Sequence, residues 1–143
     1  MSLQSKYILM CDEVRQEVSG KLLIIGLYTP DIGLTQIPFT LPYLTFLLNM
    51  ESDRPGSYQM RFTLSHLESG QQIANGMGGF AVQRPGQLVI PVPIPGVRFS
   101  APGAYTFSLH VEGERDPFTS SFAVQLLAPQ PVPGFQMPNL GRH

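Results

Sequence analysis

Hydrophobic and polar residues alternate with a period of two along most of this chain. The alternation runs through residues 58–65, 105–112 and 118–126. Successive side chains of a β-strand point to opposite faces, so this pattern predicts strands with one face in a core and the other in solvent. No long stretch shows a helical period, and the chain is therefore expected to be all-β.

Two further segments, residues 21–28 and 44–50, are more continuously apolar, which is typical of central strands or of strands covered on both faces. Glycine- and proline-containing turns follow at short intervals, and this spacing predicts an antiparallel β-sandwich of about seven to nine strands. The glycine turn before Tyr105 is similar to the tyrosine corner of immunoglobulin-like sandwiches, so we expect that class. A lipocalin-like barrel is the alternative, although prolines interrupt too often for long, even hairpins.

Prolines occupy alternate positions within residues 89–97. Successive residues of a strand direct their N–H groups toward opposite edges, so these prolines remove donors from one edge only. The pattern predicts an outer strand protected against edge-to-edge pairing, with its aliphatic residues in the core. A proline-rich ligand for an SH3-like partner is the rival interpretation. The prolines are Pro91, Pro93 and Pro95, and the aliphatic residues that precede them are Ile90, Val92 and Ile94.

The alternation stops after Leu127, which suggests two parts. A length of 143 residues fits one domain. We assign residues 1–127 to the β-sandwich domain and residues 128–143 to a proline-rich C-terminal tail, expected to be an extended arm. Its apolar residues Phe135, Met137 and Leu140 could dock on this domain or on another chain.

Composition narrows the classes of function. The net charge is −1, charged residues make up only 13%, and lysine and arginine form no cluster, so we expect neither nucleic-acid nor membrane binding. The longest apolar run, residues 22–27, is too short to span a bilayer. Cys11 is the single cysteine, which excludes an internal disulfide and suits the cytoplasm, where we expect the protein to be.

Sequence motifs of catalysis are missing. There is no G-x-S-x-G elbow, phosphate-binding glycine loop, H-E-x-x-H or C-x-x-C, so we predict a protein that is not an enzyme and uses no cofactor. A hydrolase or thiol enzyme built on Cys11 or on a histidine is the alternative. Cys11 shares its strand parity with Tyr7 and Leu9, which favours a buried apolar role.

Charged residues concentrate in the predicted loops. If the main strands alternate up and down, with residues 31–36 as a connection, the segments 12–20, 51–56, 83–86 and 112–117 share one end. A strand at residues 32–37 would reverse the alternation and dissolve this group. The end could be a recognition surface or take Ca²⁺, but arginines there compete by ion pairing, so no metal site is assigned. The binding candidates are Asp12, Glu13, Arg15, Glu51, Asp53, Glu112, Glu114 and Asp116.

A set of residues in the opening segment and in a later strand forms a recognisable pattern. The set is Cys11, Asp12, Val14, Arg15, Glu17, Gly20, Lys21, Gly26 and Tyr28, with Gly103 and Tyr105 in the later strand. In this pattern the chain resembles a family of small uncharacterised bacterial proteins. The resemblance covers most of residues 5–127. It implies a bacterial, cytosolic, all-β single domain, and it brings no catalytic residues or cofactor.

These observations lead to two hypotheses about function. The first is a non-enzymatic β-sandwich module that acts through a protein partner or as a homo-oligomer. The second is a module that binds a small molecule or a cation with the charged loop end.

Overall fold

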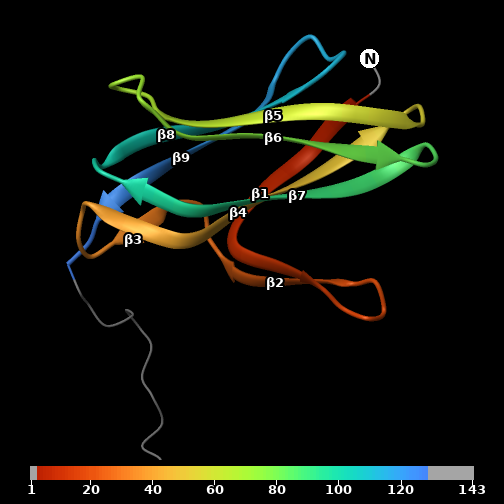
Figure 1. Ribbon diagram of the computed structural model, residues 1–143. Coiled ribbons are helices and arrows are strands. Elements are labelled where there is room, and N and C mark those ends of the chain that lie inside the picture. Colours follow the sequence, from red (N-terminus) through yellow and green to blue (C-terminus); the bar gives the residue numbers. More distant parts are fainter. Residues whose placement is uncertain (1–2, 129–143) are drawn as a thin grey trace, which may run out of the picture.

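The computed structural model describes residues 3–128, which form nine β-strands and no helix (Figure 1). The expected all-β class and number of strands are confirmed. The predicted tail lies outside the described residues from position 129 onward. No helix of this range is long and apolar enough to cross a membrane. The strands are β1 (Leu3–Gln16), β2 (Leu22–Leu27), β3 (Ile32–Leu34), β4 (Phe39–Ser52), β5 (Gly56–His66), β6 (Gln72–Val82), β7 (Gly86–Phe99), β8 (Gly103–Val111) and β9 (Phe118–Leu126).

The strands form two sheets rather than one closed barrel. One sheet has the order β2-β1-β4-β7, and the other has the order β3-β9-β8-β5-β6. All pairings are antiparallel except that of β3 with β9, which is parallel. The lipocalin-like alternative is therefore wrong.

Aromatic rings from the two sheets meet in one core. The ring of Phe46 in β4 stacks on that of Phe107 in β8 with 4.0 Å between their centroids, and Phe99 in β7 meets Tyr105 edge-on at 5.1 Å. Alternate residues of β8 are buried, as its period of two predicted. The hydroxyl of Tyr105 donates a hydrogen bond to the Ala101 carbonyl oxygen at 2.6 Å, which satisfies this buried phenol.

The two continuously apolar segments differ in burial. Residues 44–48 of β4 are buried, as expected for a central strand. The same expectation for β2 is wrong, because most of this strand is exposed. The cause lies in β1, which pairs with β4 only as far as Cys11 and from there pairs with β2. The second half of β1 and β2 therefore form a hairpin at the margin of the sheet, and Figure 1 shows β2 and its turn set apart from the other strands.

The expected grouping of charged loops is wrong for residues 12–20. The turns after β4 and β6 adjoin each other, since Ser52 pairs with Gly86. The loop after β8 lies at the same end, because the Glu112 N–H donates to the Gln59 carbonyl at 2.9 Å. Residues 12–20 lie away from that end, because β1 is antiparallel to β4. Residues 32–34 form strand β3. A strand in this segment reverses the up-and-down alternation on which the predicted grouping of charged loops depends.

Candidate functional site

The hairpin of β1 and β2 is closed by a short turn that needs a glycine. The N–H of Gly20 donates to the Glu17 carbonyl at 2.9 Å, and the N–H of Glu17 donates to the Lys21 carbonyl at 2.7 Å. Gly20 has a φ of 92°, in the left-handed region that residues with a Cβ rarely adopt. This is the usual geometry of a three-residue hairpin loop, in which glycine takes the left-handed position.

The base of the hairpin is held by contacts around Asp12. The hydroxyl of Tyr28 donates to Asp12 Oδ1 at 2.9 Å, and that of Thr45 donates to the Asp12 carbonyl oxygen at 3.2 Å. Gly26, with a φ of 69°, lies against the Asp12 carboxylate, where a Cβ has no room. Burial, and then the Asp12 carboxylate, raises the pKa of Tyr28. The residues that carry the family resemblance thus build this hairpin.

The thiol of Cys11 lies at the same base and is fully buried, as predicted. Burial is the main reason that the pKa of Cys11 is raised, and the neighbouring Asp12 raises it further. A reactive thiol needs the opposite environment, one that favours the thiolate. At neutral pH this side chain is therefore a protonated, apolar part of the packing.

Beyond the base of the hairpin, β2 is apolar on both faces, whereas the part of β1 that pairs with it carries Glu13 and Arg15. The exposed fraction is 39% for Leu22, 47% for Leu23, 37% for Ile24 and 49% for Leu27, and Val18 at the turn is fully exposed. We call these five residues the hairpin surface. Consecutive residues point to opposite faces of a strand, so neither face of β2 is polar. Contiguous exposed apolar residues on an edge strand are characteristic of contact surfaces.

The opposite margin of the same sheet is β7, the strand with alternating prolines. Its predicted position at an edge and the predicted burial of its aliphatic residues are confirmed. Ile90, Val92 and Ile94 are almost fully buried and lie opposite Leu48, Phe46 and Leu44 of β4.

A groove opens where β1 leaves β4. It has a volume of about 410 Å³ and runs over the outer side of β4 and β7. We call it the proline groove. Its lining includes Asp12, Glu13 and Val14 of β1, Tyr43 of β4, and Pro91, Pro93 and Pro95 of β7. Most of this lining is apolar, with two carboxylates on the β1 side.

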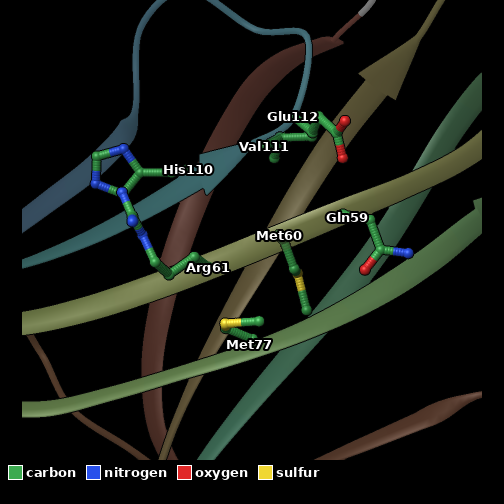
Figure 2. A pocket seen from close by; sticks show the side chains of 7 residues that line it. All are labelled: Gln59, Met60, Arg61, Met77, His110, Val111 and Glu112. Atoms are coloured by element: carbon green, nitrogen blue, oxygen red, sulfur yellow. The ribbon is translucent and has the colours of Figure 1, made fainter.

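A second depression, of about 270 Å³, lies on the five-stranded sheet (Figure 2). Arg61 of β5 is opposite His110 of β8, and Figure 2 shows their side chains next to each other. Met77 of β6 is also opposite Arg61, so these three residues share the outer face of the sheet. Met60 is opposite Gly78 and packs on the core side, and the Glu112 side chain lies apart from the others. The outer face of the depression thus combines two nitrogen-bearing groups with one thioether.

The predicted binding residues do not form one group. Asp12, Glu13 and Arg15 lie in β1, where Arg15 Nε is 3.1 Å from Glu13 Oε1. Glu51 is paired with Lys6, 2.9 Å from its ammonium nitrogen. Asp53 follows β4, and Glu112, Glu114 and Asp116 lie in the loop after β8. Within residues 3–128, no three His, Cys, Asp or Glu side chains lie close enough together to hold a metal ion. A binding role for these residues stays a prediction.

Sequence reasoning missed the apolar hairpin surface and the groove. The apolar run itself was visible in the sequence, and so was the Asp12 to Tyr28 spacing. What the sequence did not reveal is that β1 changes its partner strand after Cys11.

The fold and these surfaces define an all-β protein of two facing sheets. The chain belongs to a family of unknown function, DUF6941, whose profile matches residues 6–120. The predicted membership of an uncharacterised family is confirmed. No curated protein matches the sequence.

Solved structures show that the fold occurs in unlike proteins. The alkylpurine DNA glycosylase AlkC of Pseudomonas fluorescens, bound to DNA with an abasic site analog, is 15% identical with a TM-score of 0.52, over 87% of this chain and 30% of that one. The C-terminal domain of wzt is 10% identical, also with a TM-score of 0.52, over 87% of this chain and 74% of that one. The chain therefore spans less than a third of the glycosylase. At these identities the likeness shows the fold alone.

Proposed function

We propose that this protein acts through self-association rather than catalysis, and that two copies join along their β2 strands. The observation that carries this proposal is the apolar, exposed edge of β2, with the five residues of the hairpin surface. Strand addition at an open edge is a common way in which β-proteins bind one another, since main-chain hydrogen bonds supply affinity.

The backbone of β2 is suited to such pairing. Because the Lys21 carbonyl accepts a bond from Glu17, which directly follows β1, alternation directs the N–H and C=O groups of Leu22 and Ile24 away from β1. No proline and no charged residue lies within Leu22–Leu27. Two such strands can pair antiparallel about a two-fold axis, and each copy then offers the same surface to the other.

The size of the surface is adequate for a dimer. Five large apolar side chains from each copy, with the paired backbones, remove on the order of 1,000 Å² from solvent, which is the size of a weak, reversible interface. Self-pairing also explains why an apolar strand that has no proline or charged residue to block aggregation can lie at an edge of the sheet.

Sedimentation of the full chain over a range of concentrations tests the proposal. We expect a monomer–dimer equilibrium that is lost in the double variant Leu22→Lys, Ile24→Lys, since charges repel across the pairing axis. Met77→Lys is the matched control, because Met77 is an exposed hydrophobic residue of the other sheet. Ile24→Pro is a second variant, which removes an outward donor without adding a charge. Circular dichroism verifies that each variant is folded. A monomeric wild type, or equal loss in the control, would contradict the proposal.

The finer class of the fold is also a proposal. We assign the sheets to the immunoglobulin-like class. The assignment is supported by the hydrogen bond from Tyr105 at the start of β8 to Ala101, four residues earlier, which is the pattern of a tyrosine corner.

The location of the protein is a further part of the proposal. We place the protein in the cytoplasm, which is consistent with the single, buried thiol of Cys11 that forms no disulfide.

A further inference from the structure

We infer that the proline groove is the binding site for an apolar, proline-rich peptide, and that its occupant is residues 129–143 of the same chain. The inference is independent of the proposed self-association, because the groove lies beside β4 and β7 rather than at the hairpin surface.

The lining of the groove matches the chemistry of such a segment. Tyr43 is 62% exposed and stands beside three prolines that also face solvent. Aromatic grooves bind proline-rich segments well, because proline restricts the unbound peptide and little conformational entropy is lost. Residues 129–143 contain four prolines together with Phe135, Met137 and Leu140.

Unpaired backbone groups in the groove offer additional bonds. Tyr43 lies opposite Pro95, and a proline has no N–H to give to β4. The backbone groups of Tyr43 therefore point away from β7, toward the side of β1. The pairing of β1 with β4 ends at Thr45, so within residues 3–128 no strand pairs with Tyr43 on that side. An extended peptide in the groove could pair with this part of β4.

The length of chain is sufficient to reach the groove. The N–H of Leu127 donates to the Leu34 carbonyl at 2.7 Å, and nine residues lead from Leu34 to Tyr43, so Leu127 lies at most about 35 Å from Tyr43. The ten residues from Leu127 to Met137 span about 31 Å in a polyproline conformation and up to about 35 Å when fully extended. The apolar part of the segment can therefore lie against Tyr43 and the prolines.

Charge favours the same occupant. Residues 129–143 contain no Asp or Glu, and Arg142 and His143 are their basic residues. Asp12 and Glu13 line the β1 side of the groove. Asp12 already accepts a hydrogen bond from Tyr28, and Glu13 accepts one from Arg15. A basic group of residues 129–143 would therefore join a network of charges and would not form an isolated surface ion pair.

Nuclear magnetic resonance of the full chain with labelled methionine methyl groups tests this inference. We expect nuclear Overhauser contacts between the Met137 methyl group and the ring of Tyr43, and a ring-current shift of that methyl signal. The contacts and the shift should disappear in Tyr43→Ser. Tyr7→Ser is the matched control, because Tyr7 is an exposed tyrosine of the same sheet outside the groove, and it should leave them unchanged.

The same spectra separate this inference from self-association. The contacts should persist in the Leu22→Lys, Ile24→Lys variant. In a sample mixed from labelled and unlabelled chains, contacts within one chain should remain, whereas contacts between chains would assign the groove to a second copy and overturn the inference. A Met137 methyl signal at its unstructured position, unchanged by Tyr43→Ser, would also overturn it.

Discussion

The two margins of the four-stranded sheet, β7 and β2, solve the problem of an open edge in opposite ways. In β7, three prolines remove the donors of the outer edge, and the residues before them are buried. In β2, the outward donors are kept and the aliphatic side chains are exposed. Since exposed edges invite pairing, the contrast indicates that one margin is closed to strand pairing while the other is open to it.

The difference follows from what lies behind each strand. β7 pairs with β4, whose side chains meet those of the second sheet, as the Phe46–Phe107 stack demonstrates. β2 pairs with the part of β1 that has left β4, so its apolar residues do not reach that core. The same residue types thus stabilise the fold at one margin and form a surface at the other.

The largest expected effect comes from deleting the same side chain at both margins. Ile94→Ala in β7 should lower the free energy of unfolding by about 2–5 kcal/mol, because it leaves a cavity in the core. Ile24→Ala in β2 should cost less than about 1 kcal/mol. Urea unfolding at concentrations where the protein is monomeric measures both. Equal losses would mean that β2 is packed like β7.

A smaller effect is expected at the base of the hairpin. Gly26→Ala forces a residue with a Cβ into the left-handed region and against Asp12, at a cost of about 1–2 kcal/mol. Hydrogen exchange should accelerate in residues 12–28 while the amides of β7 stay protected. Gly78→Ala, where a Cβ meets only the Met60 methyl group at 3.5 Å, is the control. An equal effect in the control would refute a special role of Gly26.

Alkaline pH should weaken the hairpin margin. The pKa of Tyr28 is raised above its ordinary value of 10.0, so the fold favours the protonated phenol. Its contribution is fully present below pH 10 and is lost as the pH rises beyond it. Tyr28→Phe should flatten the decline of the urea midpoint above pH 10, and Tyr105, whose pKa is also raised, should retain part of it. An unchanged slope in Tyr28→Phe would contradict this explanation.

The smallest change in stability is expected from reopening the protected margin. Pro93→Ala restores an outward N–H at an exposed position and should alter the free energy of unfolding by less than about 0.5 kcal/mol. In the Leu22→Lys, Ile24→Lys background, light scattering should nevertheless show new association through β7. If this variant stays as monomeric as its parent, the prolines are not what closes the edge.

Much of the fold could be predicted from local pattern. The period of two placed β5, β8 and β9, and the alternation of prolines was sufficient to place β7 at an edge with Ile90, Val92 and Ile94 inside. These predictions succeed because side-chain direction and backbone donors alternate within a single strand. The burial of Cys11 followed from the same parity.

The candidate sites could not be predicted in this way. The charged residues were grouped by counting strands, and one short strand, β3, together with the pairing of β1 beside β4, separates residues 12–20 from the other loops. The groove depends on the point at which β1 leaves β4, which is directly after the pair of Cys11 with Thr45. Neither feature has a local signal, because both are set by which strands become neighbours.

By itself, the sequence determined the strands with a clear period of two, namely β5, β8 and β9, and the protected edge of β7, since these depend on residues only a few positions apart. Only the tertiary structure decided that the apolar run of β2 is a surface and that Tyr43 and the prolines line one groove. The physical reason is that burial depends on which sheet lies opposite a strand, and residues far away in the chain supply that sheet.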